Sequence, residues 1–141
     1  MANDILAIKD KVQRYIVDWA GSAQVDRDGD FFIRYGSSTI FLSVKPFGDD
    51  SSIVRVFSVT NREVPASPEL FEFIATSSYW FGNLLCTCKD GLATVMFSHT
   101  LLGDFLDPEE LKTAVAMVGL TADKLDDTIA ARFGGTPVAK E

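Results

Sequence analysis

The sequence predicts an α+β fold in which a single antiparallel sheet is packed with helices, in the order α-β-β-β(-β)-α-β-β-α. Three observations predict it. Apolar residues recur at three- and four-residue spacing near the N-terminus and after residue 107, as they do in amphipathic helices. Short runs of alternating apolar residues lie between these segments. Two Asp-Gly pairs, at residues 28–29 and 90–91, are typical turns of β-hairpins.

One domain is the expected organisation. The chain has 141 residues, of which 47% are hydrophobic, so it can bury a core of its own. It contains no internal repeat and no low-complexity tract. We expect the domain to span residues 1–135 and residues 136–141 to form a flexible tail, because Gly134 and Gly135 end the last helix.

The charge and the hydropathy limit the partners. The 13 basic and 20 acidic residues give a net charge of -7, which repels a phosphate backbone, and the basic residues form no cluster in the sequence. The N-terminal residues have no basic segment before an apolar run, and no stretch approaches the length that crosses a bilayer. We therefore expect a cytoplasmic chain without nucleic-acid partner and without membrane insertion.

The N-terminal half begins with a helix and continues with strands. The helix is expected from Ile5 to about Trp19, with Asn3 or Asp4 as its cap and Gly21 at its end. The expected strands that follow cover residues 24–26, 31–35, 39–45 and 53–59.

The second and third of these strands leave one apolar face and one mixed face. A turn at Ser37 and Ser38 would set three apolar pairs opposite each other: Tyr35 and Ile40, Ile33 and Leu42, and Phe31 and Val44. The other face then carries Phe32, Arg34, Phe41, Ser43 and Lys45. That face is too apolar for an ordinary solvent surface and too polar for a core, which makes it the first candidate for a binding surface.

A second helix begins at Ser67-Pro68-Glu69, where a capping serine precedes a proline at the first helical position. The large apolar side chains expected on it are Leu70, Phe71, Phe73, Ile74, Trp80 and Phe81. A helix that is apolar on more than one side must bury more than one side, either beneath neighbouring elements or against another copy of the chain, and the second is the simpler arrangement. We therefore expect a homodimer, with Phe71, Ile74 and Trp80 as candidate contacts.

The C-terminal half is expected to form a hairpin and then helices. The turn at residues 90–91 sets Cys88 opposite Ala93, Cys86 opposite Val95 and Leu84 opposite Phe97, and places Met96 on the other face. Asp107, Pro108 and Glu110 form a strong helix start. We expect this helix to end at Gly119 and a second piece to cover residues 122–132, with Asp123, Asp126 and Asp127 on its solvent side.

No residue pattern indicates a catalytic site, a metal site or a cofactor site. Cys86 and Cys88 lack the further ligands of a metal site, and His99 has no nucleophile motif as a partner. The segment from Asp26 to Asp30 is similar to the start of a calcium loop, but the sixth and twelfth positions are Phe31 and Ser37 instead of glycine and glutamate. We assign no catalytic residue, no metal ligand and no cofactor, and we predict that the chain is not an enzyme.

The chain resembles the YbjN-like and type III secretion chaperone-like domains. The order of elements is similar over nearly the whole chain, and the last third carries the motif-level likeness, a leucine-rich strand exit followed by a helix that starts D-P-E-E-L. The matching residues are Leu101, Leu102, Gly103, Asp104, Leu106, Asp107, Pro108, Glu109, Glu110 and Leu111, then Ala122-Asp123, Leu125-Asp126 and Arg132-Phe133-Gly134-Gly135.

This resemblance implies a compact α+β domain that often dimerises and, in the secretion chaperones, holds an unfolded stretch of a partner protein on apolar surface without using ATP. The corresponding expectation here is a peptide- or protein-binding chaperone or adaptor, with Phe32, Phe41 and Met96 as candidate peptide-binding residues. The alternative is a structural or regulatory domain that acts through homodimerisation alone. An acidic chain would favour a basic or amphipathic client.

Overall fold

In the computed structural model, which describes residues 4–140, seven strands form one antiparallel sheet with the order β1-β2-β3-β4-β6-β5, and β7 pairs with β4 beside this path. The α+β class and the order of elements predicted from the sequence are confirmed. The elements are α1 (Ile5–Ala20), β1 (Gln24–Val25), β2 (Phe31–Tyr35), β3 (Ser38–Phe47), β4 (Ser51–Pro65), α2 (Pro68–Thr76), β5 (Asn83–Lys89), β6 (Leu92–Leu102), α3 (Pro108–Phe133), β7 (Thr136–Pro137) and a 3₁₀ turn (Val138–Lys140).

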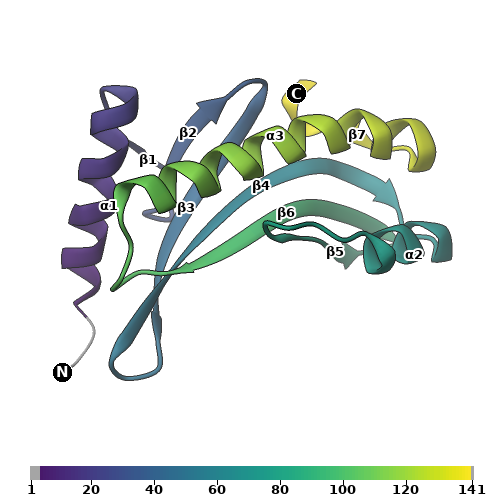
Figure 1. Cartoon of the computed structure of the whole chain (residues 1–141). Coiled ribbons are helices and arrows are strands. Elements are labelled where there is room, and N and C mark those ends of the chain that lie inside the picture. The colour runs from purple at the N-terminus through teal and green to yellow at the C-terminus, as the bar shows by residue number, and fades with distance from the viewer. Residues whose placement is uncertain (1–3, 141) are drawn as a thin grey trace.

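The helices bury their apolar residues against one face of the curved sheet, which we call the inner face. Helix α3 runs along this face, while α1 stands at one end of the molecule and α2 lies at the other (Figure 1). Val12 of α1, Leu70 of α2 and Leu111 of α3 belong to one buried cluster with the inward residues of the strands. The opposite face, which we call the outer face, has no helical cover in the part of the chain that is described.

Strands β2 and β3 pair two residues away from the register expected from the sequence. The observed partners are Phe31 and Leu42, Ile33 and Ile40, and Tyr35 and Ser38. The turn lies at Gly36 and Ser37 because Gly36 adopts a positive φ of 61°, which glycine tolerates. A shift of two residues keeps every side chain on its face, so the division into an apolar inner face and a mixed outer face holds.

Strand β4 is longer than expected, and its extension holds the C-terminal segment. The strand continues to Pro65 through two register shifts against β6, between Val59 and Asn61 and between Asn61 and Val64. Past the N-terminal end of β3, where that strand no longer pairs with β4, Asn61 and Arg62 of β4 pair with β7. Residues 136–140, where the sequence suggested a flexible tail, therefore have defined secondary structure, and Pro137 is buried. Residue 141 and the candidate cap Asn3 lie outside the described residues.

Helix α2 starts as predicted and ends earlier than predicted. The Ser67 hydroxyl accepts the Leu70 N–H at 3.1 Å, and Pro68 occupies the first turn. The helix ends at Thr76, where Ser77 turns to extended backbone. The expectation that Trp80 and Phe81 lie on this helix is therefore wrong, since both belong to the segment that leads into β5.

Helix α3 is one continuous helix through Gly119, where the sequence suggested a break. A β-carbon at Gly119 would lie 2.5 Å from Cδ1 of Tyr35, so the glycine allows the helix to approach β2 closely. The expectation that Asp126 faces solvent is also wrong, because this residue is buried. Its backbone carbonyl accepts a hydrogen bond from the side-chain amide of Asn61. The start is as predicted, with the Asp107 carboxylate accepting the Glu110 N–H at 2.8 Å.

Candidate functional site

A row of three phenylalanines crosses the outer face from β2 to β4. Phe41 pairs with Phe32 on one side and with Phe57 on the other. Its ring centroid lies 6.2 Å from that of Phe32 and 5.3 Å from that of Phe57, and the second pair is stacked. All three side chains are half-buried, although no helix covers them. Each of the three therefore keeps part of its surface in contact with solvent.

A second apolar row continues the surface toward the other edge of the sheet. Val59 of β4 pairs with Met96 of β6, and Met96 pairs with Leu85 of β5. The structure therefore brings the three candidate residues from the sequence, Phe32, Phe41 and Met96, onto one face. It adds the side chains that lie between them, Phe57 and Val59, together with Leu85.

Sequence analysis missed Phe57 and Val59 although a signal was present. Strand β4 alternates strictly from Ser51 to Thr60 between half-buried and buried positions, and Phe57 and Val59 fall on the half-buried face. Alternation of this kind could have assigned both residues to the outer face once the strand was located. We give the name outer patch to six apolar residues of this face, namely Phe32, Phe41, Phe57, Val59, Leu85 and Met96.

A groove of about 390 Å³ lies where the outer patch meets the loop between β1 and β2. Phe41, Phe57 and Val59 line it together with Arg62 and the aspartates and arginine of residues 26–30. The Asp26 carboxylate accepts the N–H groups of Asp28 and Asp30 at 2.9 and 3.0 Å. These bonds close a tight turn, which is the interpretation that the sequence favoured over a calcium loop.

Arg55 places a positive charge within the outer patch. Its guanidinium carbon lies 4.7 Å from the centroid of the Phe57 ring, a cation–π distance. Its Nε donates to the Ser98 hydroxyl at 3.0 Å and its Nη2 to the Met96 sulfur at 3.4 Å. The guanidinium is thus held against the apolar surface by uncharged neighbours.

The three candidate dimer contacts differ in exposure. Trp80 is 99% exposed and Phe71 is 43% exposed, whereas Ile74 packs partly against the core. Phe71 and Ile74 lie on α2, and Trp80 lies in the segment between α2 and β5. A fully exposed tryptophan is unusual on a monomeric surface and is typical of a protein contact.

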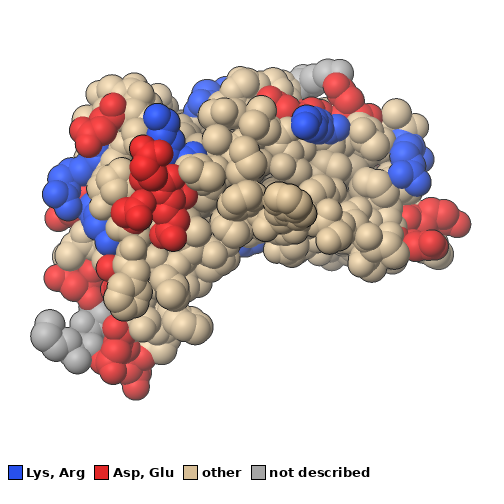
Figure 2. Space-filling model, in the orientation of Figure 1, with Lys and Arg blue, Asp and Glu red and all other residues tan. Residues whose placement is uncertain are grey.

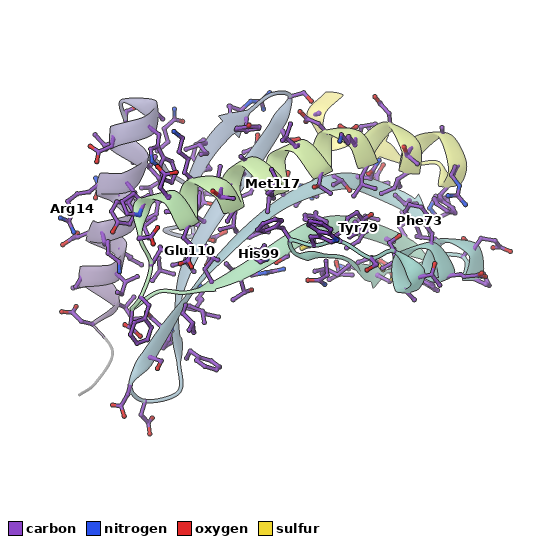
Figure 3. The ribbon with its side chains drawn as sticks, in the orientation of Figure 1. Arg14, Phe73, Tyr79, His99, Glu110 and Met117 are labelled. Carbon is purple, nitrogen blue, oxygen red and sulfur yellow. The ribbon has the colours of Figure 1, made fainter. Side chains whose placement is uncertain are left out.

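A second hollow, of about 380 Å³, lies on the inner face between β6 and the start of α3. Phe81, His99 and Leu101 form its apolar side, and Asp107, Glu109 and Glu110 line it from α3. Acidic side chains gather over the start of α3, next to a broad uncharged area (Figure 2). His99 and Tyr79 lie between α3 and β6, below Met117 (Figure 3). The His99 ring meets Phe81 edge-on at 5.9 Å, a packing contact.

The remaining chemical candidates form no site. Cys86 and Cys88 are both free, and burial raises the pKa of the Cys86 thiol, with a further contribution from Cys88, which disfavours a reactive thiolate. Across residues 4–140, no group of three His, Cys, Asp or Glu residues is placed to hold a metal ion. Within the same range, no helix is long and apolar enough to cross a membrane.

Comparison with known proteins identifies a family whose model matches the sequence and a solved structure with a similar fold. The model of a family described as "T3SS (YopN, CesT) and YbjN peptide-binding chaperone 1" matches residues 7–141. The Yersinia pestis type III secretion chaperone SycH, solved in complex with a stable fragment of YscM2, has a similar structure. The two share 9% identity with a TM-score of 0.57, over 82% of this chain and 97% of the other. No curated protein matches the sequence.

Proposed function

The chain belongs to the family of T3SS (YopN, CesT) and YbjN peptide-binding chaperones, and on this premise we propose that it binds an extended segment of a partner protein on the outer patch. It acts as a non-enzymatic chaperone or adaptor, and the cytoplasm is the compartment that we propose for it. SycH, which has the same fold, was crystallised with a fragment of another protein, which is consistent with the proposal.

The observation that carries the proposal is an apolar sheet face without a helical cover. In a sheet that is packed on one side only, the other face normally carries polar residues. Here Phe41 and Phe57 stack on that face, and Val59 and Met96 extend it across β4 and β6. An exposed apolar surface with a polar rim is typical of a protein-interaction site.

The chemistry of the outer patch suits an extended peptide. Side chains of an extended chain alternate between two sides, so every second residue of a bound segment can contact Phe41, Phe57 and Val59. Burial of each apolar side chain contributes on the order of 1 kcal/mol or more. Several such contacts would hold an unfolded segment reversibly, without a covalent step.

Capture of partners from cells that express the protein tests this function. The tagged chain is isolated from a gentle lysate, and its partners are identified by mass spectrometry, alongside the Phe41→Asp variant. We expect one or a few partners that require Phe41 and that bind through a segment lacking folded structure. Identical partner sets for both proteins would contradict the proposed surface.

Self-association is the second proposed property, and the exposed Trp80 favours it. Exposed aromatic side chains are common anchors of protein interfaces, and Phe71 of α2 is exposed as well. We propose a homodimer that uses Phe71, Ile74 and Trp80. In the alternative function, this dimer alone would be the active form and no client would bind.

Trp80→Ser is expected to raise the dissociation constant of this dimer about tenfold or more, because truncating a buried tryptophan anchor costs on the order of 2 kcal/mol. Sedimentation velocity across a concentration series measures the constant. Phe105→Ser is the matched control, since Phe105 is 82% exposed but follows β6 at a different part of the chain. A wild-type protein that stays monomeric, or equal effects of both variants, would contradict the proposed contact.

A further inference from the structure

We propose that the outer face selects partner segments in which a carboxylate side chain lies between apolar side chains. The inference rests on the proposed peptide-binding function and names the chemistry of the client. It reverses the expectation from the overall charge, which was a basic or amphipathic client. The reason is that the charges of this chain are distributed unevenly over its elements.

Almost all of the charged side chains on the strands are basic. Within the seven described strands, the basic residues are Arg34, Lys45, Arg55, Arg62 and Lys89, and the acidic residue is Glu63. Glu63 lies in the irregular part of β4, where its φ is positive. The acidic residues that give the chain its net charge of -7 therefore lie on helices, loops and ends. A peptide on the outer face meets a locally positive surface.

Arg55 is the side chain that would meet the client carboxylate. It is half-buried in the outer patch, and in the described part of the chain its contacts are Phe57, Ser98 and Met96, none of which is an anion. A guanidinium has five N–H donors, so donors remain for a further acceptor. Hydrogen bonds between a guanidinium and a carboxylate are roughly twice as strong as those between neutral groups.

Other charges near the groove limit where this carboxylate can lie. Asp26, Asp28 and Asp30 border the groove beside Phe41 and would repel an acidic client residue at that end. Arg55 pairs with Ser43 and Thr100, one row away from Phe41 and Phe57. Charges on the helices are attenuated, since the screening length is about 8 Å at physiological salt. The guanidinium itself reaches Ser98 and Met96 of β6, so the geometry puts the client carboxylate beside these two residues.

A single-stranded nucleic acid is the competing anionic ligand for a face with aromatic and basic residues. Such ligands stack their bases on open ring faces. The rings of Phe41 and Phe57 stack on each other with an interplanar angle of 22°, and Arg55 covers Phe57. The ring faces that a base would need are thus partly occupied by Phe41, Phe57 and Arg55 themselves. The arrangement favours a peptide.

The test uses end-blocked fluorescent peptides with the core Phe-Ser-X-Ser-Phe-Ser-Val, in which X is Glu, Gln or Lys. Residues two apart share a side of an extended chain, so X and the apolar residues face the sheet together. In a second set, X exchanges places with the following serine and faces away. Fluorescence anisotropy measures how tightly each peptide binds to the wild type, to Arg55→Met and to Lys124→Met. The last variant is the control, since it removes one positive charge from an exposed position of α3.

We expect the wild type to bind the Glu peptide about tenfold more tightly than the Gln peptide, and the Lys peptide most weakly. Arg55→Met should remove the difference between Glu and Gln while leaving the Gln affinity within about twofold, since methionine keeps the apolar stem. Lys124→Met should keep the difference. In the second peptide set, the difference should be absent in all three proteins.

Each of the other outcomes would contradict one specific part of the proposal. Equal binding of the Glu and Gln peptides, or a preference for Lys, overturns the selectivity and leaves the peptide-binding function intact. A Glu preference that survives in Arg55→Met overturns the role of this arginine. Tighter binding of a short single-stranded RNA that competes with the Glu peptide assigns the face to nucleic acid. Failure of every peptide to bind overturns the outer patch as a peptide site altogether.

Discussion

Phe41→Asp should abolish client capture while leaving the chain folded. Phe41 is the middle ring of the row, 6.2 Å from Phe32 and 5.3 Å from Phe57, so a bound segment must desolvate whatever side chain stands there. We expect at least a thirtyfold loss of peptide affinity, because losing a central interface contact costs on the order of 2 kcal/mol. Peptide anisotropy measures this loss, and circular dichroism checks the fold.

The stability cost of Phe41→Asp should be about 1–3 kcal/mol for the two aromatic pairs that it removes, which a domain with about 5–15 kcal/mol of stability tolerates. Each aromatic pair contributes about 0.5–1.5 kcal/mol, and the new carboxylate can remain in water in the free protein. Phe47→Asp is the matched control, since it makes the same change on the same strand at a position that is 57% exposed. Unfolding of Phe41→Asp would assign this residue to the core, and full capture by a folded variant would move the site to another surface.

Alternation along strands allowed the faces to be predicted, but turns decided the register. The pairs Cys88–Ala93, Cys86–Val95 and Leu84–Phe97 are confirmed, because Asp90-Gly91 offers one two-residue turn. Between β2 and β3, the sequence Gly36-Ser37-Ser38 offers two possible turns, and the wrong one gave a shift of two residues. Since that shift preserves the faces, Phe32 and Phe41 were still assigned together correctly to the outer face.

The features that the sequence did not reveal depend on distant parts of the chain. The guanidinium of Arg55 is held beside Phe57 because Ser98 and Met96 of β6 accept its N–H groups, and no local pattern encodes that contact. The pairing of β7 depends on how far β4 extends beyond β3. Helix α2 was predicted to be too long because an apolar run continues to Phe81. Burial of apolar residues alone does not distinguish a helix from an irregular segment that packs on it.

Gly119 is the residue at which local propensity and packing predict opposite effects. Glycine inside a helix is about 1 kcal/mol less favourable than alanine, so an end or a break was the reasonable expectation from sequence. In the structure, α3 continues, and a β-carbon at this position would lie 2.5 Å from Cδ1 and 2.9 Å from Cγ of Tyr35. The glycine thus lowers the intrinsic stability of the helix but allows α3 to approach the sheet closely.

Gly119→Val should therefore lower the free energy of unfolding by about 1–3 kcal/mol, since this cost of overpacking a buried contact exceeds the few tenths of a kcal/mol that valine gains over glycine in helix propensity. Urea denaturation measures the change. In a Tyr35→Ala background the steric conflict is absent, so the same substitution should cost less than about 1 kcal/mol relative to that background. Equal costs in both backgrounds would mean that Tyr35 is not the obstacle. A stabilising effect in the native background would mean that the helix does bend or break at Gly119, as its sequence first suggested.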